Sequence, residues 1–449
     1  MLNSDCAMEN FDLIVIGAGP GVYEAAAGAA ALGRRVAVIE RDELGGTCLN
    51  RGCIPTKALC RSAEVAMTVG NSSEFGISAG EPVIDLPRIM ARKDEILAGL
   101  RESVGMVLND VTVIRGEAKF ICASTVEVNG ECYTAYEIIV ATGSRPVMLD
   151  IPGKELALSS DEILSIQTLP SSLIIIGGGV IGMEFASIFS AFGVKVTVLE
   201  YCKEILPPFD VEIAKRLRTS LKRRGIEIVT SAQVTAINPG LTVEYEVKGK
   251  SKTAEAEQVL MAVGRRPVVP EGLDGIGVRF ERGAIAVDDN MKVLFDGSAP
   301  ENVTLYAIGD VNGRCMLAHA AYMHGLVALG KAKLTDIIPA AVFTWPECAM
   351  VGLTEEQCVT IGRQIKTGKA MFRSNGKALA MGEPDGLVKI IADSETDELL
   401  GCHICGAHAA DLVQEVATAM TAGLKASAIS TAVHAHPTLT EVVKAAVPK

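Results

Sequence analysis

The sequence predicts an α/β protein with two nucleotide-binding domains followed by an α+β domain. A unit of strand, glycine turn, helix, strand and acid occurs twice, and the acid lies 23 positions after the first glycine in both copies. From about Pro339 onward strands and helices continue without a glycine fingerprint. The 449 residues exceed one ordinary domain. We therefore expect two Rossmann-like three-layer dinucleotide-binding domains plus a C-terminal α+β domain.

The first copy begins with the apolar, β-branched run Phe11 to Ile16, which predicts a buried strand. The glycine turn G-A-G-P-G follows, and an alanine-rich helix comes next. Gly17 permits the tight turn, and Gly19 lets the backbone approach a pyrophosphate at the helix N-terminus. Glu40, after the second strand, would accept hydrogen bonds from ribose hydroxyls. Val22 stands at the third fingerprint position, so we expect the helix to lie slightly further from the sheet.

The second copy has all three fingerprint glycines. The strand Leu173 to Ile176 leads into G-G-G-V-I-G at Gly177 to Gly182, and a second strand ends at Glu200. The matching spacing of the two copies indicates an internal duplication. Each copy is later followed by a related strand and glycine turn, which end at Pro146 and Pro267.

The segments between and after the copies set the domain boundaries. The alternating pattern from Ile114 to Tyr136 predicts a β-meander, and Thr304 to Asp310 predicts a strand that ends in Gly309-Asp310. The second nucleotide domain is therefore expected to be inserted into the first. We predict a first nucleotide-binding domain over 1–147, a second over 148–267, a segment completing the first over 268–338, and a C-terminal domain over 339–449.

The segment from Gly45 to Leu59 carries the cysteines Cys48 and Cys53. A regular helix would hold residues five apart too far from each other for their sulfurs to bond, but Gly52 allows a distortion. Pro55, two positions after Cys53, fits the first turn of a helix. Cys53 is therefore expected near a helix N-terminus, where a thiolate is stabilised. Lys57 adds a positive charge one turn later. By spacing alone, a redox pair and two buried structural cysteines both remain open.

Composition limits the classes of function. The net charge of -12 argues against nucleic acid as a partner. No apolar run approaches the 18 residues of a membrane span, and residues 1–10 have acidic but no basic side chains, unlike a secretory signal. The twelve scattered cysteines fit a reduced, cytoplasmic chain. Cys402 and Cys405 form a C-x-x-C on a predicted strand, and we expect no metal site there.

The segment H-A-H-P-T-L-T-E, from His434 to Glu441, lies close to the C-terminus. Taken alone, its two histidines fit a solvated tail or an H-x-H metal pair.

The segment from Gly45 to Leu59 resembles the redox-active disulfide segment of the flavin-dependent pyridine nucleotide–disulfide oxidoreductases, and most closely that of the dihydrolipoyl dehydrogenases. The glycines, Asn50, Pro55 and Lys57 all match. The resemblance covers essentially the whole chain. It implies FAD in the first nucleotide domain, NAD in the second, and a C-terminal α+β dimerisation domain. A flavin is needed because a dithiol cannot hand a hydride directly to a nicotinamide.

The resemblance also implies the roles of single residues. Cys48 would exchange with the substrate dithiol, and Cys53 would lie nearer the flavin. His436 would be the catalytic base, with Glu441 as its orienting carboxylate, whereas His434 would be structural. Glu184 would pair with Lys57 beside the flavin, and Asp310 would hold its ribityl chain. The implied cofactor-binding residues are Gly17, Gly19, Gly21, Glu40, Thr47, Lys57, Ala118, Thr142, Gly143, Asp310, Ala318, Gly177, Gly179, Gly182, Glu184, Glu200, Val234 and Gly264.

The activity implied is the oxidation of protein-bound dihydrolipoamide by NAD⁺. The partners implied are a second copy of the chain and the lipoyl domains of a 2-oxoacid dehydrogenase or glycine cleavage complex. Glutathione reductases and mercuric reductases of the same family are the alternatives, and a non-catalytic flavoprotein would need neither the cysteine pair nor His436. The family usually has a histidine where this chain has Trp345, and an acidic stretch where Tyr322-Met323-His324 stand.

Overall fold

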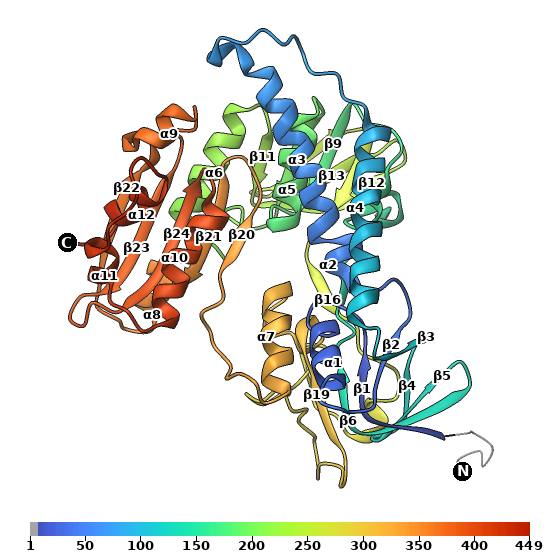
Figure 1. Cartoon of the computed structure of the whole chain (residues 1–449). Coiled ribbons are helices and arrows are strands. Elements are labelled where there is room, and N and C mark those ends of the chain that lie inside the picture. The colour runs from blue at the N-terminus through green and yellow to red at the C-terminus, as the bar shows by residue number, and fades with distance from the viewer. Residues whose placement is uncertain (1–7) are drawn as a thin grey trace. The chain divides into compact units, whose positions relative to one another are not determined.

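The computed structural model describes residues 8–449, so the first seven residues of the predicted domain 1–147 lie outside the described residues. The chain forms two compact units (Figure 1). Unit 1 holds the residues up to 58 together with 90–147 and 265–335, and unit 2 holds 59–89, 148–264 and 336–449.

Unit 1 is built on a seven-stranded sheet in the order β3-β2-β1-β6-β5-β4, with β19 also paired to β6. β1 pairs in parallel with β2 and β6, and β6, β5 and β4 form the predicted antiparallel meander. All five residues of β2 are buried, as expected of a parallel strand covered on both faces. The strands are β1 Met8–Ile16, β2 Val36–Glu40, β3 Thr112–Arg115, β4 Lys119–Cys122, β5 Thr125–Val128, β6 Glu131–Val140 and β19 Thr304–Ala307.

Helices α1 and α7 of unit 1 lie side by side next to this sheet (Figure 1). A Cβ at Gly21 would lie 2.6 Å from the carbonyl oxygen of Ala321, so the glycine allows α7 to approach. The helices that lie wholly or partly in unit 1 are α1 Tyr23–Ala30, α2 Gly46–Arg51, α3 Cys53–Gly70, α4 Leu86–Val107 and α7 Ala318–Ala328. The sequence patterns did not predict α2 or the long α4.

The two copies differ in where the helix after the glycine turn begins. In the second copy α5 begins at Val180, whereas α1 begins at Tyr23, three positions later than the equivalent residue Pro20. A Cβ at Gly182 would lie 2.0 Å from the carbonyl oxygen of Gly177, so a valine at the equivalent position cannot come this close. The larger distance of α1 from the sheet stays a prediction.

Unit 2 contains the second nucleotide-binding sheet, in the order β11-β10-β9-β15-β8 with parallel neighbours. A separate antiparallel sheet, β12-β13-β14, follows β11 in the chain. The elements are β8 Leu158–Ser159, β9 Ser172–Ile176, α5 Val180–Ala191, β10 Lys195–Glu200, α6 Val211–Arg223, β11 Glu227–Thr230, β12 Ala232–Asn238, β13 Thr242–Val247, β14 Lys250–Glu255 and β15 Gln258–Met261.

The two related segments that follow the copies pair with each other. β7, Ser144–Pro146, runs antiparallel to β16, Arg265–Pro267. The short strands β17, Phe280–Glu281, and β18, Ala284–Ile285, also pair.

The C-terminal part of unit 2 is a five-stranded antiparallel sheet in the order β20-β21-β24-β23-β22. α10 lies across it and contacts β21 and β24 (Figure 1). The predicted α+β character and the absence of a glycine fingerprint agree with this arrangement. Its elements are β20 Ala340–Val342, β21 Glu347–Gly352, α8 Glu355–Thr360, β22 Ile365–Met371, α9 Gly376–Ala380, β23 Leu387–Asp393, β24 Leu399–Gly406, α10 Ala409–Thr421, α11 Ala426–Thr431 and α12 Thr440–Ala445.

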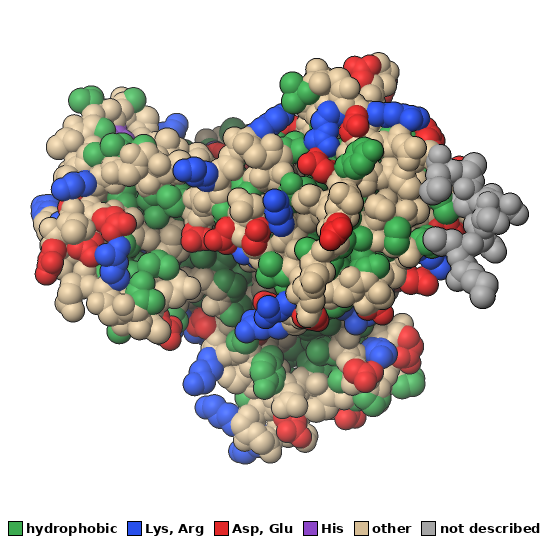
Figure 2. Space-filling model, turned by 90° about the horizontal axis from the view of Figure 1, so that it is seen from below, with side chains coloured by type: hydrophobic (Ala, Val, Ile, Leu, Met, Phe, Trp, Pro, Cys, Tyr) green, Lys and Arg blue, Asp and Glu red, His purple; other side chains and the backbone are tan. Residues whose placement is uncertain are grey.

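Two further properties of the molecule concern membrane-spanning segments and the distribution of charge on the surface. Within residues 8–449, no helix is both long and apolar enough to cross a membrane. Acidic and basic side chains are interspersed on the face that Figure 2 shows.

Candidate active site

The cysteine pair lies at a break between two helices. α2 ends at Arg51, Gly52 adopts φ −143° and ψ −111°, and α3 begins at Cys53. A Cβ at Gly52 would lie 3.0 Å from the carbonyl oxygen of Thr47 and 3.3 Å from the Cα of Cys48. The glycine thus lets the chain fold back so that the thiols of Cys48 and Cys53 form a hydrogen bond. The helix start at Cys53 confirms the prediction from the sequence.

The electrostatics of the pair separate its two members. The hydrogen bond with Cys53, burial and the charge of an ionised Cys53 all raise the pKa of Cys48, while Lys57 opposes this. A second negative charge next to the first is unfavourable, so one thiolate is formed first. Cys53 starts the 18-residue helix α3, and the N-terminus of a helix stabilises negative charge.

Asn50 fixes the loop that carries the cysteines. Its side-chain nitrogen donates to the carbonyl oxygens of Leu44 at 3.0 Å and Gly46 at 2.9 Å, and its oxygen accepts from Nε of Arg101 on α4 at 2.8 Å. A Cβ at Gly46 would lie 2.7 Å from the Cα of Gly19. The cysteine segment therefore packs directly on the first glycine turn. The role of Arg101 had no signal in the sequence.

The first glycine turn is shaped for a nucleotide. Gly17 has φ +108°, and a Cβ there would lie 2.4 Å from the carbonyl oxygen of Ala141, whereas one at Gly19 would meet nothing within 4 Å. The open side at Gly19 leaves room for a phosphate. Glu40 is buried, and its two oxygens accept from the N–H groups of Ala18 at 2.8 Å and Asp42 at 2.9 Å. These bonds fix its carboxylate in place.

The second turn repeats the geometry of the first. Gly177 has φ +109° with a Cβ position 2.4 Å from the carbonyl oxygen of Ala262, and the Cβ position of Gly179 is open. The oxygens of Glu200 accept from the N–H groups of Gly178 and Cys202. Both turns therefore fit the pyrophosphate and adenosine ribose of a dinucleotide.

Asp310 lies in the turn Gly309–Asn312, which follows β19. Its Oδ2 accepts a hydrogen bond from Oγ of Ser144 at 2.5 Å. Arg265 in turn donates from Nε to Oγ of Ser144, and from Nη2 to the carbonyl oxygen of Ser144, both at 2.8 Å. The residues that hold Asp310 thus come from the paired strands β7 and β16. Sequence reasoning singled out those two segments but not Ser144 or Arg265.

The remaining implied cofactor residues occupy varied positions. Thr47 lies on α2, Lys57 lies on α3, and Ala318 begins α7. The hydroxyl of Thr142, the residue before Gly143, donates to the carbonyl oxygen of Val268. Ala118 and Val234 are buried, and Gly264 has φ +116°. Their contacts with a cofactor stay predictions.

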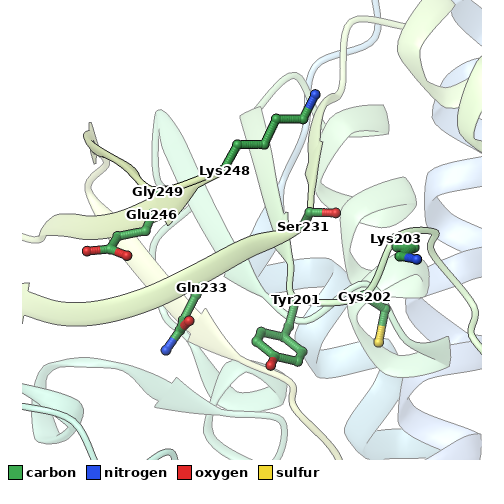
Figure 3. A pocket seen from close by; sticks show the side chains of 8 residues that line it. All are labelled: Tyr201, Cys202, Lys203, Ser231, Gln233, Glu246, Lys248 and Gly249. Carbon is green, nitrogen blue, oxygen red and sulfur yellow. The ribbon is translucent and has the colours of Figure 1, made fainter.

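A pocket of about 570 Å³ lies next to Glu200 in the chain (Figure 3). Tyr201, Cys202 and Lys203 reach it from the loop after β10, and the other lining residues come from the link between β11 and β12, from β12 and β13, and from the turn after β13. Lys248 is a second cation of this lining besides Lys203. The lining residues are Tyr201, Cys202, Lys203, Ser231, Gln233, Glu246, Lys248 and Gly249.

The histidines His434 and His436 of unit 2 differ in their surroundings. Nδ1 of His436 lies 3.0 Å from Oε1 of Glu441, whose other oxygen accepts from the N–H of Thr438. The side chain of His436 is 79% exposed. His434 is instead bound through Nε2 to Glu415 at 2.9 Å, with only 7% of its side chain exposed. His436 is therefore an oriented and accessible imidazole, and His434 is part of the structure.

Two further candidates are placed in unit 2. The carboxylate of Glu184, buried on α5, accepts from the N–H of Phe343 at 2.9 Å. Cys402 and Cys405 lie three positions apart on β24, so their side chains point to opposite faces of the sheet. That arrangement prevents them from binding one metal ion together.

Comparison with known proteins settles the family. Residues 11–325 match the family model described as pyridine nucleotide-disulphide oxidoreductase, and residues 338–447 match its dimerisation domain. The chain belongs to the pyridine nucleotide-disulphide oxidoreductase family. The predictions of family and fold class are thereby confirmed.

Several curated members of this pyridine nucleotide-disulphide oxidoreductase family are similar over nearly their whole length. The dihydrolipoyl dehydrogenase of Thermus scotoductus is 40% identical and covers 97% of this chain and 96% of its own. Those of Geobacillus stearothermophilus and Bacillus subtilis are 39% and 37% identical, covering 98% and 96% of this chain and 96% of their own. Among solved structures, the HOCl-induced flavoprotein disulfide reductase RclA from Escherichia coli superposes with a TM-score of 0.84 at 29% identity, covering 97% of this chain and 99% of RclA.

Members of the family use FAD and NAD, which confirms the predicted cofactors. The two glycine turns fit these two dinucleotides, as their open Gly19 and Gly179 positions indicate. The match to the dimerisation domain supports the predicted homodimer.

Proposed function

We propose that this protein is an NAD-dependent dihydrolipoyl dehydrogenase that oxidises dihydrolipoamide to lipoamide and reduces NAD⁺ to NADH. The hydrogen-bonded pair of Cys48 and Cys53 at the start of α3 carries this proposal. The names of the most similar curated relatives support it.

In the oxidised enzyme, Cys48 and Cys53 would form a disulfide. A substrate thiolate attacks the sulfur of Cys48 and releases Cys53 as a thiolate, and the second substrate thiolate then displaces Cys48 and closes the lipoyl disulfide. The substrate is oxidised by two electrons, and the enzyme is left as a dithiol. FAD, when bound, relays these two electrons to NAD⁺.

His436 would accept the proton from the attacking substrate thiol, since only a thiolate attacks a disulfide. Glu441 holds the imidazole through Nδ1, which leaves Nε2 to take the proton. Neighbouring Val433 is 97% exposed, like most of the His436 ring. An exposed base beside an exposed apolar side chain supports a site completed by a second copy of the chain, with His436 acting on its partner's cysteines.

The substrate group would be presented by lipoyl domains of a 2-oxoacid dehydrogenase or glycine cleavage complex, in the cytoplasm. The chemistry supports this choice of carrier because a lipoyl group supplies two thiols that close into one ring disulfide.

The test is a comparison of disulfide substrates with NADH as the electron donor. The purified flavoprotein is assayed with lipoamide, oxidised glutathione and mercuric ion. We expect lipoamide to be reduced at least a hundredfold more efficiently than the other two, in kcat/KM. A preference for glutathione or mercuric ion would assign the chain to another activity of the family. Cys48→Ser serves as the control and should be inactive with every disulfide.

A further inference from the structure

His324 lies on α7, six positions after the first residue of that helix, and only 1% of it is exposed. The mechanism proposed above does not use it. A buried imidazole normally has a hydrogen-bonding partner, so its contacts indicate its role.

The partners of His324 belong to the turn that carries Asp310. The backbone N–H of Gly309 donates to Nδ1 of His324 at 3.2 Å, and the side-chain nitrogen of Asn312 lies 3.4 Å from the same atom. That amide also donates to the carbonyl oxygen of Ala307, at the end of β19, at 3.0 Å. His324 thus ties α7 to both ends of the turn Gly309–Asn312.

The close approach of α7 to the turn is built into the sequence. Gly309 has φ +69°, and a Cβ there would lie 3.1 Å from the Cβ of Ala321. A side chain at this position would therefore be strained and crowded. The glycine brings its own N–H within reach of His324, one turn of helix beyond Ala321.

The imidazole acts as an acceptor only when Nδ1 is unprotonated. Burial, reinforced by the positive charge of Arg314, lowers the pKa of His324 to about 4. Arg314 is itself held in place by Asp289 and by the carbonyl oxygen of Val287. At neutral pH the ring is therefore neutral, and its proton lies on Nε2.

We propose that His324 is a positioning residue for FAD binding: its Nδ1 holds the N–H of Gly309 and so fixes Asp310 against the ribityl chain of the flavin. This inference rests on the role proposed for Asp310. Ser144, itself bound by Arg265, donates to the Asp310 carboxylate, whereas His324 holds the backbone N–H of Gly309, the residue before Asp310. Without the imidazole acceptor, the N–H of Gly309 would be left without a side-chain partner at the buried end of the turn.

The first experiment compares two variants that differ in the acceptor. His324→Leu keeps apolar volume but removes the acceptor, and His324→Asn places an amide oxygen near the position of Nδ1. Flavin is removed from each protein, and the dissociation constant for FAD is measured by fluorescence at pH 7. We expect His324→Leu to weaken FAD binding by about tenfold. His324→Asn should recover most of that loss.

Val327→Ala is the matched control, because Val327 is a buried residue of α7 that packs in the main core. It should lower thermal stability and leave the dissociation constant for FAD within about twofold of the wild type. If His324→Leu binds FAD as tightly as the wild type, or if His324→Asn is as weak as His324→Leu, the proposal is wrong. A wild-type protein that binds no FAD would instead refute the proposed function.

A second measurement does not depend on the folding of any variant with the acceptor removed. In protein labelled with ¹⁵N-histidine, the signals missing from His324→Asn identify His324. We expect the neutral ring with the proton on Nε2 at pH 7, unchanged down to about pH 5. A proton on Nδ1, or titration near the ordinary pKa of histidine, about 6.5, would contradict the hydrogen bond from Gly309.

Discussion

Gly52 explains why two cysteines five positions apart can meet. Its break between α2 and α3 brings the thiols of Cys48 and Cys53 into a hydrogen bond. The sequence contained enough to predict this, since the glycine and the helix start at Cys53 both follow from local chemistry. It did not contain the bracing by Arg101 or Ser144, because those contacts join residues 51 and 166 positions apart.

Nucleotide choice is also decided by single residues. Two backbone N–H groups fix the Glu200 carboxylate, which would bind the ribose hydroxyls of NAD and repel the 2′-phosphate of NADP. We expect the wild type to prefer NADH over NADPH at least a hundredfold in kcat/KM, about 3 kcal/mol. Glu200→Ala should reduce the preference to about tenfold or less, because Lys203 and Lys248 remain in the neighbouring pocket.

The control for this change is Glu246→Ala, which removes an acid of the same pocket that lies on β13. It should leave most of the preference intact. Equal turnover of NADH and NADPH by the wild type would show that Glu200 does not select the nucleotide.

At the scale of elements, the strands and helices that flank the two glycine turns follow their sequence patterns closely. β9 was predicted at Leu173 to Ile176 and runs Ser172–Ile176. α2 and α4 were not predicted, because one is a single short turn beside a glycine-rich segment and the other has apolar residues spread between many charges. Buried charge was not predicted either. A lysine is normally expected at the surface, but only 1% of Lys389 on β23 is exposed.

Lys389 joins α6 to the C-terminal sheet. Its Nζ donates to Oδ1 of Asp210, the N-cap of α6, at 2.9 Å and lies 3.1 Å from Oε2 of Glu355. Lys389→Met leaves the buried Asp210 carboxylate without its cation, so we expect a loss of about 3 kcal/mol in the free energy of unfolding. Denaturation is followed by the fluorescence of Trp345, the single tryptophan, which lies in unit 2.

Lys369→Met is the control, since Lys369 pairs with Glu212 at a half-exposed site, and it should cost below about 1 kcal/mol.

The stabilisation by Lys389 and Asp210 depends on pH, and the pKa of Asp210 gives the sign. Burial, the largest single influence, raises the pKa of Asp210, but the hydrogen bond and charge of Lys389, the charge of His403 and the N–H of Glu212 together lower it. The stabilisation by this pair is therefore present above the ordinary pKa of aspartate, about 4, and is lost at lower pH. Equal stability of Lys389→Met and the wild type would refute this account.

At the scale of the whole molecule, the two groups of residues in the proposed reaction belong to different compact units of the chain. The cysteine pair belongs to unit 1, and His436 and Glu441 belong to unit 2. The internal duplication made the number of nucleotide domains readable from the sequence. The sharing of each site between two chains has no local signal in the sequence; the resemblance to the family implies it, and the exposure of His436 supports it.

Complementation tests whether two chains share each site. Cys48→Ser and His436→Gln are unfolded together and refolded as a mixture. Each mixed dimer would hold one intact and one doubly damaged site, so random pairing should restore about a quarter of wild-type activity per chain. Each variant refolded alone provides the control. Activity that stays at the level of these parents would mean that His436 serves its own chain.

Reduction by dihydrolipoamide without NAD⁺ tests the central claim most directly. The oxidised flavoprotein is mixed anaerobically with dihydrolipoamide, and its absorbance is recorded in a stopped-flow instrument. We predict a fast two-electron reduction with a long-wavelength shoulder, which arises from the Cys53 thiolate beside the flavin. The shoulder should be absent in Cys53→Ser, and reduction should be lost in Cys48→Ser and slowed at least a hundredfold in His436→Gln, as expected for a general base. A wild-type enzyme that NADH reduces but dihydrolipoamide does not would contradict the proposed function.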